Sequence, residues 1–84
     1  MERMTYKTEA GWQVPEGQLE EALERLARFE DAYEAILADQ EALTAKLEPL
    51  KAAGKQKSAQ FRELLGQKLV NQQILIRLEY AGIS

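Results

Sequence analysis

The sequence contains no cysteine and no histidine among its 84 residues. This absence excludes disulfide bonds, thiolate and imidazole metal ligands, cysteine nucleophiles and histidine general bases. Helical bundles that hold two metal ions typically use a Glu-x-x-His motif, which a chain without histidine cannot supply. We therefore predict a protein that is not an enzyme and that holds no cofactor or metal.

Long apolar runs are also missing. No stretch of 18 apolar residues is present, and the first eleven residues lack the apolar region of a signal peptide. A chain of 84 residues is long enough for one domain with a modest core. We expect a single domain covering residues 1–84, a cytoplasmic location and no membrane partner.

Charges of opposite sign are divided between the two halves of the chain. Residues 16–50 contain ten acidic and three basic side chains, whereas residues 51–84 contain six basic and two acidic ones. Three interpretations remain open: an acidic surface that binds a basic partner, an attraction between the two halves, or a solvated helix face with pairs four residues apart. Those pairs are Glu21–Arg25 and Glu24–Arg28. The candidate partner-binding acids are Glu30, Asp31, Glu34 and Glu41.

A heptad pattern over residues 18–50 predicts one long helix at about residues 17–50, because nine of its ten core positions are apolar. The a positions are Leu19, Leu26, Tyr33, Gln40 and Leu47, and the d positions are Ala22, Phe29, Ile36, Leu43 and Leu50. Leu23 and Leu37, both at e, widen the stripe in the way that a helical bundle requires. The start is expected near Pro15 to Gln18, and Pro49 is expected to kink or end the helix.

The segment AAGKQKS, residues 52–58, predicts a turn at about 54–57 between an acidic helix (16–53) and a second helix with its tail (58–84). Gly54 is suited to a left-handed helix end, and Ser58 to the N-cap of the next helix. A phosphate-binding P-loop is not expected, since it needs a second glycine five residues earlier and a preceding strand. The exposed lysines of this turn stay candidate phosphate contacts: Lys51, Lys55 and Lys57.

The second segment, about residues 58–81, carries two apolar stripes. The first contains Phe61, Leu64, Leu65, Leu69, Leu75, Ile76 and Tyr80, and the second contains Val70, Ile74 and Leu78. Alternation in residues 74–80 also suits a strand, but we favour a helix because no turn residue precedes this run. Two helices alone cannot cover both stripes, which predicts a homo-oligomer. Its expected interface consists of Val70, Ile74, Leu78, Leu23 and Leu37.

The N-terminal residues 1–15 form either an extended arm or a short hairpin, and Met4, Tyr6, Trp12 and Val14 are placed to cap the end of a helical pair. The predicted fold class is thus all-α: an antiparallel two-helix hairpin with a short extended N-terminal arm, assembling into an oligomeric helical bundle.

Both ends of the chain carry family-like patterns. The opening "MERMTYKTEAG", followed by "EEALERLARFEDAYE", and the tail "KSAQFRELLGQKLVNQQILIRLEYAGI" are the segments concerned. They resemble short uncharacterised helical proteins of phages, prophages and mobile elements of Gram-positive bacteria. In the tail the matching positions are Phe61, Leu64, Leu65, Gln67, Lys68 and Leu69, and then Glu79, Tyr80, Gly82 and Ile83. The resemblance implies an accessory protein in a bacterial host that binds and blocks a host factor such as a defence nuclease.

Two function classes follow. The first is a non-enzymatic protein–protein interaction module, an inhibitor or adaptor that acts on a host protein through its acidic helical surface. The alternative is a small nucleic-acid-binding accessory protein that uses the basic turn and the second helix.

Overall fold

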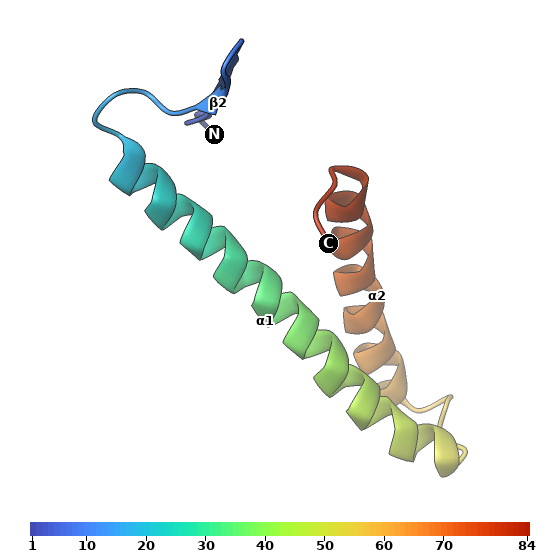
Figure 1. Cartoon of the computed structure of the whole chain (residues 1–84). Helices are drawn as coiled ribbons and strands as arrows, with labels where there is room; N and C mark the ends of the chain where they lie inside the picture. The colour runs from blue at the N-terminus through green and yellow to red at the C-terminus, as the bar shows by residue number, and fades with distance from the viewer. The chain divides into compact units, whose positions relative to one another are not determined.

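The computed structural model describes all residues, Met1 to Ser84. Two short strands, β1 (Tyr6–Thr8) and β2 (Gly11–Gln13), precede two helices, α1 (Leu19–Ala52) and α2 (Ala59–Tyr80) (Figure 1). The chain forms two compact units, Met1–Tyr33 and Glu34–Ser84, and α1 contributes residues to both. The expectation of a mostly helical chain with two helices is confirmed.

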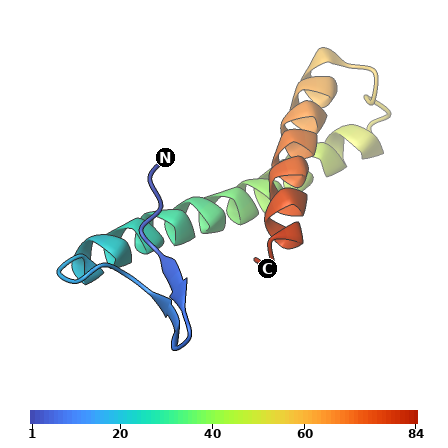
Figure 2. The same cartoon turned by 90° about the horizontal axis from the view of Figure 1, so that it is seen from above.

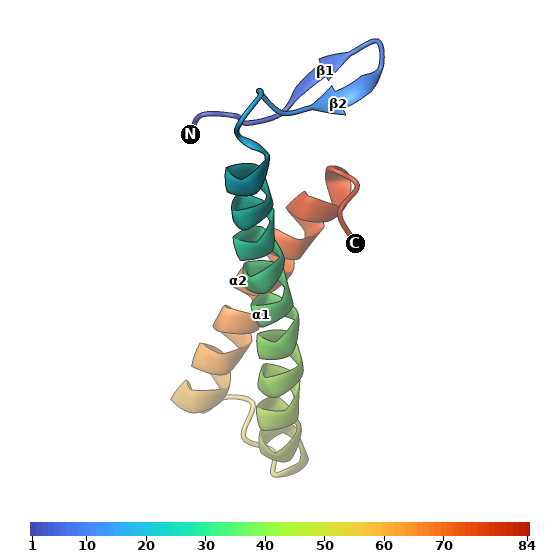
Figure 3. The same cartoon turned by 60° about the vertical axis from the view of Figure 1, so that its left-hand side comes forward.

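The N-terminal residues form a hairpin in which β1 and β2 pair antiparallel, with Tyr6 opposite Gln13 and Lys7 opposite Trp12 (Figure 3). Thr8 holds the connecting turn, since its Oγ1 accepts the Ala10 N–H at 3.2 Å and donates to the Gly11 carbonyl at 3.1 Å. Such a side-chain turn stabilises the loop between two short strands. The extended arm is therefore the wrong alternative for residues 6–13, and the hairpin is the correct one.

A tight turn precedes α1. The Gln18 N–H donates to the Pro15 carbonyl at 3.0 Å, and Gly17 has a φ of 82°, which glycine adopts without strain. The helix then begins at Leu19, one residue after the predicted range, and Pro15 lies in the turn instead of at the first helical position. Glu20 and Glu21 in the first turn are stabilised by the helix dipole.

Of the two alternatives for Pro49, a kink or the end of the helix, the second is wrong, because the helix continues to Ala52 with Pro49 inside it. Proline removes one backbone donor, and this position is close to the end, where few further helical bonds depend on it. The Pro49 carbonyl still accepts the Ala53 N–H at 3.0 Å. The end of the helix is fixed by Gly54 instead.

Gly54, with a φ of 72°, terminates α1 in a Schellman motif. The Lys55 N–H donates to the Leu50 carbonyl at 2.8 Å, and the Gly54 N–H donates to the Lys51 carbonyl at 3.0 Å. Four residues after Gly54, Ser58 caps α2, since its Oγ accepts the Phe61 N–H at 3.1 Å. Both predicted caps are confirmed, and Figure 2 shows the turn between them as the yellow loop.

The second helix is continuous through residues 74–80, so the strand alternative is wrong. Its end repeats the motif of α1. The Ile83 N–H donates to the Leu78 carbonyl at 3.0 Å, the Gly82 N–H donates to the Glu79 carbonyl at 2.9 Å, and Gly82 has a φ of 87°. No helix of the chain combines the length and apolar character needed to cross a membrane.

The core of the second unit is small and lies close to the turn between the helices. It consists of Leu43, Leu47 and Phe61, which are 2%, 5% and 7% exposed. Two polar links join α1 to α2 further along: Gln40 to Lys68, and Asp39 to Asn71. Earlier α1 residues thus pair with later α2 residues, as the antiparallel prediction requires.

The predicted first stripe of α2 is only partly covered. Phe61 is buried, but Leu65, Leu69 and Tyr80 are exposed. At about 100° per residue, the covered face is centred between Phe61 and Asn71, which leaves Leu65, Leu69 and Tyr80 on one flank of it. Val70 and Ile74 lie on the opposite flank. The helix therefore presents two separate apolar flanks to its surroundings.

Candidate protein-binding surface

The first half of α1 carries an uncovered apolar ridge, which we define as Leu19, Leu23 and Leu26. Their side chains are 60%, 56% and 52% exposed. Spacings of four and three residues place them within about 60° of one another on the helix. Large side chains gathered on one helix side and exposed to this extent are typical of surfaces that bind another protein element. The ridge is the first component of the candidate site.

The N-terminal segment lies beside this part of α1. Arg25 fastens it, because its Nη1 donates to the Glu2 carbonyl at 2.6 Å. An apolar groove of about 320 Å³ lies between the segment and the helix. Its lining residues are Met1, Arg3, Met4, Thr5, Ala22, Arg25, Leu26 and Phe29. Two methionines in the lining give the groove a surface that adapts to the shape of an apolar side chain.

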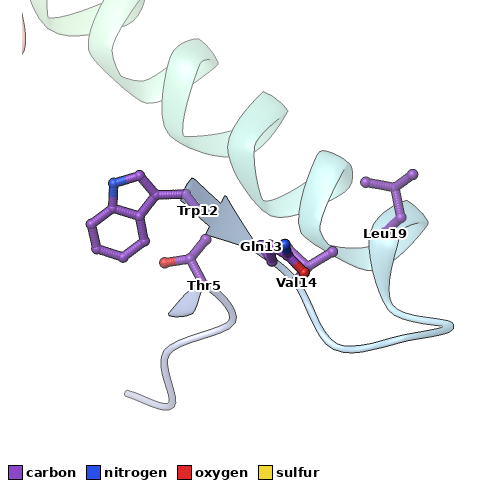
Figure 4. A pocket seen from close by; sticks show the side chains of 5 residues that line it. All are labelled: Thr5, Trp12, Gln13, Val14 and Leu19. Carbon is purple, nitrogen blue, oxygen red and sulfur yellow. The ribbon is translucent and has the colours of Figure 1, made fainter. Parts of the chain in front are cut away.

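Trp12 forms a second apolar feature of the same unit. The guanidinium carbon of Arg3 lies 4.9 Å from the centre of the Trp12 ring, and the Lys7 ammonium lies 6.0 Å from it. These cation–π contacts hold the indole although most of it stays exposed. A shallow groove of about 400 Å³ runs from Trp12 along Thr5, Gln13 and Val14 to Leu19 (Figure 4). Leu19 therefore contributes both to the ridge and to this groove.

The predicted acidic residues all have exposed side chains. Glu30 and Asp31 belong to the first unit, but as neighbours they point about 100° apart around the helix. Glu34 and Glu41 belong to the second unit. Spacings of four and seven residues place Glu30, Glu34 and Glu41 within about 40° of one another around α1. These three, unlike Asp31, are candidates for a shared contact.

Ion pairing within the chain leaves the candidate acids free. The predicted pair of Glu24 and Arg28 forms, at 3.8 Å, and as an exposed pair it stabilises α1 by less than about 1 kcal/mol. The predicted pair of Glu21 and Arg25 does not form, because Arg25 binds the Glu2 carbonyl instead. The carboxylates of Glu34 and Glu41 make no ion pair.

Of the predicted oligomer contacts, Val70, Ile74, Leu23 and Leu37 are exposed, whereas Leu78 is half-buried. A shallow groove of about 480 Å³ lies beside Val70 and is also lined by Asp39, Gly66, Gln67 and Asn71. The three predicted phosphate contacts are exposed around the turn between α1 and α2: Lys51, Lys55 and Lys57. They form no ion pair with an acidic side chain.

A polar layer crosses the second unit between its two helices. The Asn71 Nδ2 donates to the Asp39 carboxylate at 2.6 Å, and the Gln40 Nε2 donates to the Lys68 carbonyl at 3.1 Å. The other amide atom of Gln40, Oε1, is buried without a hydrogen-bond partner. An unsatisfied buried acceptor is destabilising, so Gln40 fixes the register of the helices at a cost in stability.

Gln40→Leu is therefore expected to raise the free energy of unfolding by about 1 kcal/mol, because it removes the unsatisfied oxygen and adds apolar contact. Urea unfolding followed by far-UV circular dichroism measures the change. Gln60→Leu, at an exposed position of α2, is the control and should change stability by less than about 0.5 kcal/mol. A less stable Gln40→Leu protein would mean that the bond to the Lys68 carbonyl outweighs the unsatisfied atom.

The sequence identified only one member of the ridge, Leu23, as an expected oligomer contact, whereas Leu19 and Leu26 were assigned to a covered seam. One signal was available: the predicted second helix is shorter than the first, so it cannot cover the whole seam. The groove beside Met1 and Met4 had no sequence signal, since it depends on the bond from Arg25 to the Glu2 carbonyl.

No protein-family model, curated protein or solved structure matches this chain. No group of three acidic side chains is placed to hold a metal ion.

Proposed function

We propose that the chain is a non-enzymatic protein–protein interaction module that acts as an inhibitor or adaptor of a host protein. One observation carries the proposal: three large apolar side chains are buried, whereas thirteen are exposed. A water-soluble chain does not keep that much apolar surface free without a partner to cover it. The resemblance of both ends to proteins of phages and mobile elements supports a role in the cytoplasm of a bacterial host.

Part of this surface is assigned to self-association. Leu23 on α1 and the two apolar flanks of α2 are exposed, as an oligomer interface requires of the single chain. Each exposed leucine that becomes covered contributes about 1 kcal/mol or more to association. A homo-oligomer thus removes much of the apolar surface from water.

The acidic side of α1 is assigned to the host protein. Glu34 and Glu41 are free of ion pairs and share one helix side. Charges arranged in this way accelerate encounter with a basic protein surface and disfavour nucleic acid.

Reversing both charges, with Glu34→Lys and Glu41→Lys, is expected to weaken the complex with the host protein about tenfold or more, because two attractive contacts become repulsive. The partner would be captured from host lysate with the unaltered chain, purified, and titrated with each variant in a calorimeter. Nuclease treatment of the lysate shows whether capture depends on nucleic acid.

Glu63→Lys with Glu79→Lys is the matched control, since it makes the same change in net charge on α2. This variant should bind the partner within about twofold of the unaltered chain. Equal loss in both variants would mean that net charge, and not the acidic side of α1, determines binding. Nuclease-sensitive capture would favour the alternative of a nucleic-acid binder acting through Lys51, Lys55 and Lys57.

A further inference from the structure

We infer that the apolar ridge of α1 is covered by α2 of a second copy of this chain, through the flank formed by Leu65, Leu69 and Tyr80. The inference deepens the proposed function, because it rests on self-association and names which surfaces meet. All three flank residues are exposed in the single chain, as the ridge residues are.

The second helix is too short to cover the whole of α1. At 1.5 Å per residue, α1 with 34 residues is about 51 Å long and α2 with 22 residues about 33 Å. Even full antiparallel packing would leave about one third of α1 without an α2 beside it. The ridge belongs to the first three turns of α1, which are the ones furthest along the chain from the turn to α2.

The ridge has an acidic border. Glu30 lies in line with the ridge, one turn beyond Leu26, and Glu20 lies about 60° to the side of Leu23. Residues 19–33 contain five acidic and two basic side chains. An apolar surface with such a border fits an apolar helix side that carries arginine or lysine at its edges.

The flank of α2 matches this requirement. Leu65, Leu69 and Tyr80 lie within about 60° of one another around the helix, and Arg62 falls within the same range. Arg77 lies about 60° beyond Tyr80 and about 20° from Val70, so it borders both flanks. The opposite flank of Val70 and Ile74 has the acidic Glu63 in line with it, where the first flank has Arg62. This difference between Arg62 and Glu63 favours the first flank for contact with the ridge.

Charge also disfavours the simplest alternative, in which two α1 ridges meet. Each copy would bring an excess of three acidic charges to that interface. Contact between α1 of one copy and α2 of the other avoids this repulsion. A two-fold axis would repeat the contact, so that each chain supplies one ridge and one flank.

Engineered cysteines test the arrangement in the full-length chain, which has no cysteine of its own. One set of ¹⁵N-labelled Leu23→Cys chains is unfolded and refolded together with unlabelled Leu69→Cys chains, and then oxidised gently. Intact mass spectrometry separates the mixed disulfide from the two homodisulfides. The mixed disulfide should exceed both homodisulfides about tenfold, because residues whose Cα atoms are more than about 7 Å apart are not bridged.

Two matched variants decide the alternatives. Glu21→Cys, about 160° around α1 from Leu23, should give only background cross-linking with Leu69→Cys. Ile74→Cys tests the opposite flank. The inference is overturned by a dominant homodisulfide of Leu23→Cys, by preferred cross-linking to Ile74→Cys, or by yields no higher than those of Glu21→Cys.

Charge exchange provides a second measurement. Chains with Glu20→Arg and Glu30→Arg, and chains with Arg62→Glu and Arg77→Glu, should each dimerise at least about tenfold more weakly in sedimentation. An equal mixture of the two should dimerise again, because both contacts of the mixed dimer are complementary; a mixture that stays monomeric overturns the inference.

None of these substitutions touches Glu34 or Glu41. If the charge exchange fails but host binding still depends on Glu34 and Glu41, the inference is overturned and the proposed function stands. If the charge exchange succeeds but host binding does not depend on these two acids, only the proposed function is overturned.

Discussion

Replacing Leu43 with alanine is expected to lower the free energy of unfolding of the second unit by about 3 kcal/mol or more. Leu43 is 2% exposed, and removing a buried leucine side chain leaves a cavity that the surroundings fill only in part. Only two other large side chains, Leu47 and Phe61, are buried with it. A core of that size leaves a small chain with few kcal/mol of stability, so this one change should leave most molecules unfolded at 25 °C. Urea unfolding followed by far-UV circular dichroism measures it.

Val70→Ala is the control for this experiment, because Val70 is among the most exposed apolar residues of α2. At dilutions where the chain is monomeric, its effect should stay below about 0.5 kcal/mol. Comparable losses in the two variants would show that Leu43 is not the centre of the core. A control variant that loses stability only at high concentration would instead report on the oligomer.

Glycine-to-alanine changes at Gly54 and Gly66 are expected to act in opposite directions. Gly54 has a φ of 72°, a conformation that costs an alanine about 1 kcal/mol or more, so Gly54→Ala should destabilise the chain. Gly66 lies inside α2, and a β-carbon there would meet no atom within 4 Å. Alanine is about 1 kcal/mol more favourable than glycine in a helix, so Gly66→Ala should stabilise it.

The two variants together should thus differ by about 2 kcal/mol in the free energy of unfolding, measured by thermal or urea unfolding of monomer. Each serves as the control of the other, because the added atoms are identical. A neutral Gly54→Ala would mean that the Schellman motif at the end of α1 is not maintained in solution. A destabilising Gly66→Ala, seen only in the oligomer, would place another helix against Gly66.

The turn between the helices could be predicted from the sequence almost residue by residue. Gly54 and Ser58 were assigned to a left-handed helix end and an N-cap, and both have those roles. Capping depends on hydrogen bonds among residues a few positions apart, so the local sequence contains the necessary information. The end of α1 was misplaced because Pro49 was given more weight than Gly54. A proline near a helix terminus removes only one bond, whereas glycine allows the chain to reverse.

The candidate surface was harder to predict, and the heptads show why. The same pattern continues from Leu19 to Leu47, yet Leu19 is 60% exposed and Leu47 is 5% exposed. Periodicity reports which side of a helix is apolar, and it contains no information about what covers that side. The difference arises from the length of α2 and the position of the turn. For the candidate acids, the spacing in the sequence is enough to show that Asp31 lies away from the side of α1 that Glu34 and Glu41 share.

Trp12, the sole tryptophan, determines what an optical experiment on this chain reports. Its indole lies in the N-terminal unit, held by Arg3 and Lys7 and largely in contact with water. Fluorescence therefore follows the hairpin of β1 and β2, whereas circular dichroism at 222 nm follows the two helices. An emission curve that changes at lower urea than the helical signal would reveal separate melting of two regions, and a single two-state fit would not describe both signals. Quenching by iodide, an anion drawn to the two flanking cations, should be stronger than quenching by caesium.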